Sequence, residues 1–325
     1  MLVSLLAGAM VMVAAGFALR ILRHWDLASG SELQVRLERQ TYLVSTLLVI
    51  CFAGQLLALI LFVMTAESMS GQFTGAMCAT GVLNVNGFGW PVLFAKIAVF
   101  FASAAWLILN HVDSQAPDYP LIRAKYLVLL CLVPLVLLET VLLFLYFLGL
   151  DPDIITSCCG SLFSASGKGV AGELSAVSPR ISLAVLILSA VCLPPAAMFS
   201  LRSRTGAFLY SLLAVTCLVV GLVSMVSLVA LYIYEHPHHH CPFCILKSGY
   251  HYIGYVLYFL LFSATSLGIG PGILAPWRNV SSLGKIIART GRRLALASLI
   301  LYSLFYGLVA VIIYCSHLTM TGVWW

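Results

Sequence analysis

The segment His236–Cys244 reads HPHHHCPFC and holds four histidines and two cysteines in nine residues. Imidazole nitrogens and thiolate sulfurs are common ligands of zinc and copper in proteins. Two cysteines separated by two residues can also cycle between a dithiol and a disulfide. A third possibility is structural, with the cysteines closing disulfides that brace a loop and the histidines lining a wet interface. The segment therefore predicts metal chemistry, thiol redox chemistry or a structural role.

For redox chemistry, the candidate catalytic residues are Cys241 and Cys244, because two intervening residues let the sulfurs meet within one turn. A protonated histidine or a helix N-terminus nearby lowers the pKa of an attacking thiol. Exchange needs a further cysteine, and the candidates are Cys78, Cys158 and Cys159. Adjacent Cys158 and Cys159 bond each other only through a strained peptide, so each is expected to pair elsewhere.

This arrangement resembles the mechanism of membrane disulfide oxidases and vitamin K epoxide reductases. In those enzymes an outer-face CxxC motif exchanges with loop cysteines and delivers electrons to a quinone, which the resemblance implies here for Cys241 and Cys244. The resemblance covers that motif and the loop cysteines only. Those enzymes are four-helix bundles, so the eight spans predicted below depart from their pattern.

For metal chemistry, the candidate ligands are the histidines and cysteines of the same segment: His236, His238, His239, His240, Cys241 and Cys244. This mixture suits zinc or copper, and thioethers such as those of Met69, Met77 and Met320 favour Cu(I). Pro237 interrupts helical pairing of the histidines, so the tract is compositional and lacks the spacing of a ligand motif. No histidine falls near the middle of a predicted span, which disfavours a membrane-buried haem but leaves open a haem at the helix ends.

The composition predicts where this segment must be held. Of the 325 residues, 62% are hydrophobic and 9% are charged, and the mean hydropathy is +1.06. Soluble domains carry about 25% charged residues, so we expect an all-α, polytopic membrane bundle of about eight helices. The predicted spans are Leu2–Leu22, Thr41–Ala66, Trp90–Asn110, Tyr126–Leu150, Ile181–Ser200, Ala207–Tyr234, Tyr252–Leu274 and Leu294–Cys315.

Basic residues predict the orientation of these spans. Thirteen lysines and arginines, Lys125 among them, lie in or beside the odd-numbered loops, and three lie in the even-numbered loops. By the positive-inside rule the odd loops are cytoplasmic and both termini lie outside. The net charge of +6 therefore reflects membrane topology and does not indicate a nucleic-acid partner.

This topology predicts one transmembrane domain over residues 1–325, with an external cap formed by loops 67–89, 151–180 and 235–251. No cysteine falls in a predicted cytoplasmic loop, a distribution that suits an oxidising compartment. We expect an integral protein of the bacterial inner membrane, with the His/Cys segment on the periplasmic side.

Three of the polar residues inside predicted spans share similar depths, roughly 9–17 Å below the outer surface at ~1.5 Å per residue. They are Lys96, Glu139 and Gln55. An ionisable residue in the membrane calls for a partner. We expect either a buried Lys96–Glu139 pair that fixes helix packing, a snorkelling Lys96 beside a protonated Glu139, or a proton or quinone site to which Gln55 contributes.

The leading functional prediction is a membrane redox protein, a thiol–disulfide oxidoreductase that uses external thiols and exchanges electrons with membrane quinone. The alternative is a membrane protein that binds copper, zinc or haem, as a transporter or as the membrane subunit of a larger complex. The expected partners are the lipid bilayer and either other subunits or an external thiol or metal partner protein.

Overall fold

A computed structural model describes residues 1–26, 31–154, 156 and 177–318 of the chain. All regular secondary structure in these residues is helical, and eight helices are long and apolar enough to cross a membrane. The predicted all-α, polytopic fold is thus confirmed, and the chain is an integral membrane protein. Cys158, Cys159 and Met320 lie outside the described residues.

The eight spans contain α1 (Leu2–His24), α2 (Glu32–Met69), α4 (Gly89–Asp113), α5 (Ile122–Leu148), α7 (Pro179–Arg202), α8 (Arg204–Ser224), α10 (Ile253–Gly268) and α12 (Gly284–Cys315). The sixth span continues from α8 through a π-helical turn, η2 (Met225–Val229), and α9 (Ala230–Tyr234). The seventh continues from α10 through α11 (Gly270–Leu274) and the short 3₁₀ helix η5 (Ala275–Trp277). Each predicted span overlaps one of these helices.

Two helices begin well before their predicted spans. α2 starts at Glu32 and α12 at Gly284, although the apolar stretches begin at Thr41 and Leu294. Hydropathy marks only the part of a helix that crosses the hydrocarbon core, about 20 residues, whereas backbone hydrogen bonds continue into the headgroup region. In α2 the polar extension carries an exposed i,i+4 ion pair between Glu32 and Arg36, with an N–O distance of 3.2 Å.

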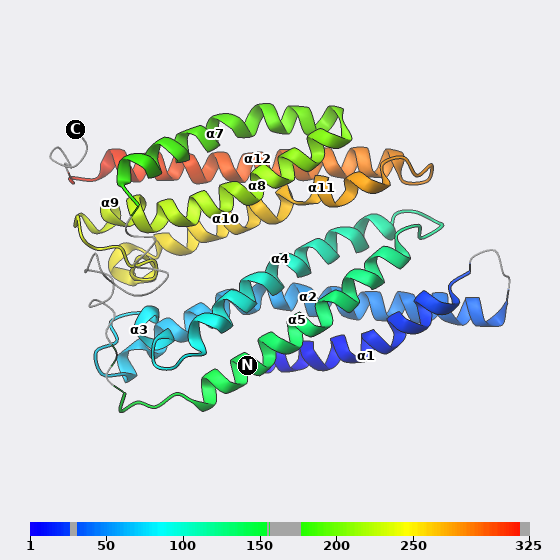
Figure 1. The fold of residues 1–325 in the computed structure, drawn as a ribbon, viewed down its shortest axis with the longest axis horizontal. Coiled ribbons are helices and arrows are strands. Elements are labelled where there is room, and N and C mark those ends of the chain that lie inside the picture. Colours follow the sequence, from blue (N-terminus) through cyan, green and yellow to red (C-terminus); the bar gives the residue numbers. More distant parts are fainter. Residues whose placement is uncertain (27–30, 155, 157–176, 319–325) are drawn as a thin grey trace. The chain divides into compact units, whose positions relative to one another are not determined.

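The chain divides into two compact units. Unit 1 comprises Met1–Thr65, Leu83–Asp151 and Trp277–Thr290, and unit 2 comprises Ala66–Val82, Pro152–Pro276 and Gly291–Trp325. In unit 1, α5 packs against both α1 and α4 (Figure 1). α1 presents a stripe of buried, mostly small residues, and the ring centroids of Phe52 and Trp106 lie 5.0 Å apart in the core.

Lys125 is a correction to the predicted loops. It was expected in a cytoplasmic loop, but it lies in the first turn of α5 and is only 2% exposed. Its Nζ atom lies 2.7 Å from Asp113 Oδ2 and donates a hydrogen bond of 3.2 Å to Asn110 Oδ1. The buried carboxylate at the end of α4 draws this lysine inward, because an internal partner replaces the water it would otherwise need. It therefore adds no exposed positive charge to that loop.

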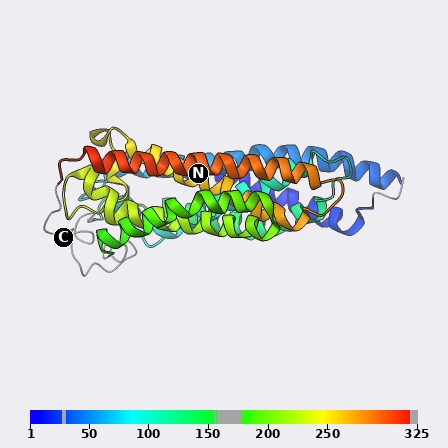
Figure 2. The same cartoon turned by 90° about the horizontal axis from the view of Figure 1, so that it is seen from above.

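In unit 2, α7 and α8 form a tight hairpin, and α8 also packs against α10 and α11. The two hairpin helices lie side by side in both views, coloured green to yellow-green (Figures 1 and 2). At the turn, Ser203 Oγ accepts a 2.9 Å hydrogen bond from Gly206 N. A side chain at Gly206 would come within 2.3 Å of the Phe199 carbonyl oxygen, so this close turn requires glycine.

The opposite end of unit 2 carries the His/Cys segment. The chain between α9 and α10 forms two short 3₁₀ helices, η3 (Cys244–Leu246) and η4 (Ser248–Tyr250). The C-terminal end of α12 is tied to the same region: Ser316 Oγ donates to the Tyr232 carbonyl at 2.9 Å, and His317 N donates to Glu235 Oε1 at 3.0 Å. These contacts anchor the end of the bundle that holds the candidate site.

Candidate metal centre

Three cysteine sulfurs of unit 2 meet at this end. The Sγ atoms of Cys78, Cys241 and Cys244 all lie within 4.8 Å of one another, and Cys78 Sγ lies 3.4 Å from Cys241 Sγ. Cys78 and Cys241 are 0% and 2% exposed, and Cys244 is half-buried. At ~2.3 Å per metal–sulfur bond, thiolates around one ion lie about 3.8–4.0 Å apart. The Cys78–Cys241 pair would therefore widen by about half an ångström, and the other S–S distances would need to shorten by an ångström or less, for the three sulfurs to hold one metal ion.

Cys78 reaches the cluster from a segment that two charged residues hold in place. It lies between the 3₁₀ helix η1 (Ser70–Gln72) and the short helix α3 (Ala79–Leu83). Glu67 Oε2, in the last turn of α2, accepts a 2.8 Å hydrogen bond from Ala79 N. Lys247 Nζ lies 3.6 Å from Glu67 Oε1 and also donates to the Met77 carbonyl. These bonds grip the chain on both sides of Cys78.

Gly75, three residues before Cys78, lets this segment pass close to the backbone of Thr156. Its φ is +83°, and a Cβ atom there would lie 2.2 Å from the Thr156 carbonyl oxygen. The segments that contain Gly75 and Thr156 are also joined by a 3.0 Å hydrogen bond from Thr156 N to the Thr74 carbonyl. Only glycine combines this left-handed conformation with so close a backbone contact.

Cys241 and Cys244 are positioned by tyrosines of the flanking helices. Tyr234 OH, from α9, donates to the Cys241 carbonyl at 2.6 Å, and Tyr258 OH, from α10, donates to the Pro242 carbonyl at 2.9 Å. After Cys244 the chain turns into η3, where Lys247 N donates to the Cys244 carbonyl at 3.1 Å. The backbone of the CPFC segment is therefore fixed by partners outside it, which favours a preformed ligand geometry.

The three thiols polarise one another. Hydrogen bonds from Cys244 and then from Cys78 hold the pKa of Cys241 well below its usual value, and Thr80 Oγ1 adds a further contact of 3.4 Å to Cys241 Sγ. The interaction with Cys241 is also the main reason why the pKa of Cys244 is raised. Within the cluster, the thiolate form is therefore favoured on Cys241 over Cys244.

The four histidines of the segment lie outside this group of sulfurs, as far as the described residues show. His240 Nδ1 lies 3.0 Å from the Val226 carbonyl, and His239 stacks on Tyr234 with ring centroids 3.9 Å apart. His236 Nδ1 accepts a 3.3 Å hydrogen bond from His238 N. Burial lowers the pKa of His239 and His240, which favours their neutral forms. A role for these histidines as metal ligands stays a prediction.

Of the cysteines predicted to take part in redox chemistry, the structure brings three together. The structure brings the redox candidates Cys78, Cys241 and Cys244 together, while Cys158 and Cys159 fall outside the described residues. The predicted metal ligand set did not include Cys78. Its 163-residue separation from Cys241 leaves no spacing motif to find; the only available signal was its place in a Gly-rich loop of the same predicted cap. Thr80 and Glu67 were missed for the same reason.

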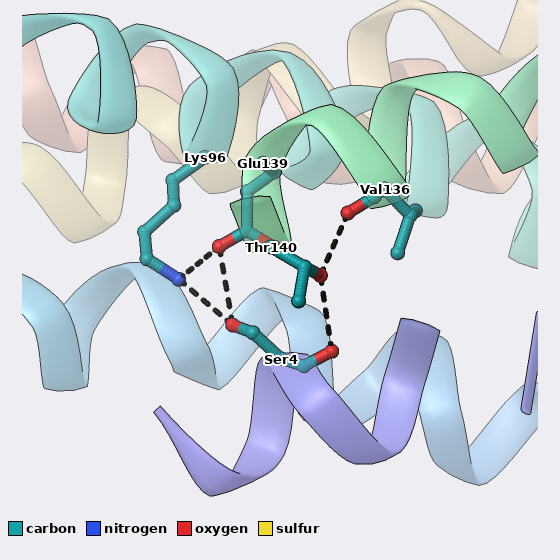
Figure 3. Close-up of polar contacts among 5 residues, drawn as sticks. All are labelled: Ser4, Lys96, Val136, Glu139 and Thr140. Carbon is teal, nitrogen blue, oxygen red and sulfur yellow. Dashed lines mark hydrogen bonds and ion pairs between the residues drawn. The ribbon is translucent and has the colours of Figure 1, made fainter. Parts of the chain in front are cut away.

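Lys96 and Glu139 pair inside unit 1. Their Nζ and Oε1 atoms lie 2.6 Å apart, and the two side chains are 3% and 0% exposed. Figure 3 shows Ser4 completing a triad: its Oγ donates to Glu139 Oε1 at 3.1 Å and accepts from Lys96 Nζ at 3.1 Å. Of the expected arrangements, the structure shows the buried ion pair. Gln55 is also buried, at 2% exposure.

Comparisons with known proteins add no relationship to this geometry. The sequence matches no protein-family model, no curated protein and no solved structure. What the chain contains must therefore carry the functional argument: eight membrane-spanning helices and a cluster of three cysteines that could bind a metal ion.

Proposed function

We propose that this membrane protein binds one thiophilic metal ion, Cu(I) or zinc, through Cys78, Cys241 and Cys244. The observation that carries the proposal is the convergence of three sulfurs within 4.8 Å. Thiolates select Cu(I) and zinc over hard cations. Two of the sulfurs are buried, and a buried thiolate needs a compensating positive charge, which a bound cation supplies.

The surrounding contacts favour binding over a merely structural role for these cysteines. Four nearby side chains bond to the backbone around the sulfurs and not to the sulfurs themselves: Glu67, Lys247, Tyr234 and Tyr258. The three sulfurs therefore face one another. Supporting bonds of this kind hold metal ligands in place in known sites. Three protein sulfurs suit trigonal Cu(I), or zinc with a fourth ligand from outside the group.

The decisive experiment measures bound metal in the purified protein. After loading with Cu(I) or Zn²⁺ under reducing conditions and removal of excess metal, we expect about one ion per chain. Cys78→Ser, Cys241→Ser and Cys244→Ser should each abolish stoichiometric binding. Cys315→Ser is the matched control, because Cys315 is an exposed cysteine outside the cluster, and it should bind like the parent protein. A parent protein that retains neither metal would refute the proposal.

Thiol–disulfide exchange is the second candidate, favoured by the 3.4 Å approach of Cys78 Sγ to Cys241 Sγ and by the stabilised thiolate on Cys241. In such a cycle Cys241 and Cys244 form a disulfide and release two electrons and two protons. A membrane quinone would accept both and become a hydroquinone. Thiol counting before and after addition of a soluble quinone tests this: loss of two thiols that Cys244→Ser prevents would support exchange, and an unchanged count would exclude it.

The proposed location is the bacterial inner membrane, with the cluster within an external cap of a single membrane domain. The support is the sequence asymmetry of basic residues; of those loop residues that the structure describes, Lys125 alone is buried. An external metal or thiol carrier, or further subunits of a complex, would then meet the cluster from outside the cytoplasm. A topology reporter fused after Trp325 should respond as external and one inserted near Arg289 as cytoplasmic; the reverse would place the cluster on the cytoplasmic face.

A further inference from the structure

The buried triad of unit 1 leaves hydrogen-bonding capacity unused. Glu139 Oε1 receives both Lys96 Nζ and Ser4 Oγ, but Glu139 Oε2 is buried with no hydrogen-bond partner among the described residues. Gln55 Nε2 and Ser103 Oγ, on α2 and α4, are buried and unmatched in the same sense. These residues are 0%, 2% and 0% exposed, respectively. Within a membrane no lipid group can satisfy such atoms.

Contacts between α2 and α4 place Gln55 and Ser103 at the same level. Phe52 lies against Trp106, with ring centroids 5.0 Å apart, and Lys96 Nζ lies 5.5 Å from the ring centroid of Phe62. The two helices are therefore antiparallel, so a residue further along α2 lies level with a residue earlier in α4. Three residues beyond Phe52 is Gln55, and three residues before Trp106 is Ser103.

Ser4 of the triad lies near the level of Gln55. Cys51 Sγ approaches the Ala7 carbonyl at 4.0 Å, and a Cβ on Gly54 would lie 3.6 Å from Val3 Cγ1. This antiparallel register sets Ser4 beside the turn of α2 that holds Gln55. Ser4 Oγ in turn touches Lys96 Nζ and Glu139 Oε1, as Figure 3 shows. Among the described residues, α2, α4 and α5 of unit 1 thus each contribute a buried, unmatched polar atom, and Gln55 lies on the turn of α2 beside Ser4 of the triad.

We infer that unit 1 holds an internal site for a hydroxyl-bearing ligand, which donates its O–H to Glu139 Oε2 and accepts from Gln55 Nε2 or Ser103 Oγ. Two sources supply this chemistry: a water molecule, or the head of a membrane hydroquinone. Each carries a donor and an acceptor on one oxygen, as the unmatched carboxylate oxygen and amide nitrogen require. Buried water typically makes about three hydrogen bonds to otherwise unsatisfied groups, which matches the number of unmatched atoms here.

The sign of a stability change tests the inference. If no ligand binds, Gln55→Leu and Ser103→Ala remove unsatisfied polar groups and should raise the Tm of the purified protein or leave it unchanged. If a ligand binds, the substitution that removes its donor should lower the Tm by a few degrees, on the order of 2–4 °C for a hydrogen bond worth about 1 kcal/mol. Ser103→Ala serves as the second variant should Gln55→Leu not fold.

Ser298→Ala is the matched control for Ser103→Ala. Ser298 is equally buried within a span, but its Oγ already donates to the Ala264 carbonyl at 2.7 Å. The fall in Tm of Ser298→Ala measures the effect of removing a serine whose hydroxyl is hydrogen-bonded. Ser103→Ala should lower the Tm by a similar amount only if a ligand is bonded to Ser103.

Extraction of the purified protein with organic solvent distinguishes the two sources. Near-stoichiometric quinone in the parent protein, lost in Gln55→Leu, identifies the hydroquinone head. A lowered Tm in at least one variant, with no quinone extracted from the parent, identifies water. A Tm that is unchanged or raised in both variants, with no quinone in the parent, overturns the inference.

Discussion

The Lys96–Glu139 ion pair offers the sharpest energetic test of unit 1. The two side chains are at most 3% exposed and their charged atoms lie 2.6 Å apart, with Ser4 Oγ as a shared partner. Removing one partner of a buried pair costs about 3–5 kcal/mol, because the other charge is left without compensation. Lys96→Met and Glu139→Leu should therefore each destabilise the protein by about that amount. At about 2–4 °C per kcal/mol, the Tm should fall by roughly 6–20 °C.

The double variant Lys96→Met/Glu139→Leu removes both charges and should recover most of that loss. Replacing a whole buried pair with apolar residues of similar volume is often neutral, or stabilising by about 1–4 kcal/mol. A double-mutant cycle, measured by thermal or denaturant unfolding of the detergent-solubilised protein, gives the coupling free energy. Single variants within about 1 kcal/mol of the parent, or a double variant as unstable as the sum of the singles, would show that the two charges are not a desolvated pair.

Three further outcomes follow from unit 2. Gly75→Ala should lower both Tm and metal content, because its Cβ would lie 2.2 Å from the Thr156 carbonyl, whereas Gly71→Ala meets nothing within 4 Å and should change neither. Replacing His238–His240 with alanine should leave about one metal ion per chain; loss of the metal would make those histidines ligands. A pH titration of thiolate absorbance should show a component that ionises below the ordinary cysteine value of about 8.5, since Cys241 has a lowered pKa. Cys241→Ser should remove that component, and its persistence would assign the thiolate elsewhere.

Local sequence was enough to determine the helical membrane architecture. An apolar run long enough to cross the bilayer must satisfy its backbone hydrogen bonds internally, so hydropathy alone predicts a helix at each of the eight spans. The similar depths of Lys96 and Glu139 also allowed a buried pair to be expected, because a charge in the membrane has few alternatives to a partner. The ends of α2 and α12 were missed, since backbone hydrogen bonding does not stop where hydropathy falls.

The membership of the three-cysteine cluster was decided by tertiary structure. The HPHHHCPFC segment drew attention to its histidines. In the structure, however, the His239 ring stacks on Tyr234, and His240 Nδ1 contacts the Val226 carbonyl. The third sulfur comes from Cys78, 163 residues away from Cys241.

Lys125 shows the same limit in unit 1, where the carboxylate of Asp113 turned an expected loop cation into a buried one. Residue type and spacing report which groups are available for chemistry along a stretch of chain. Which of them meet depends on how helices distant in sequence pack, because ligand sets and ion pairs are selected by distances of a few ångströms between side chains.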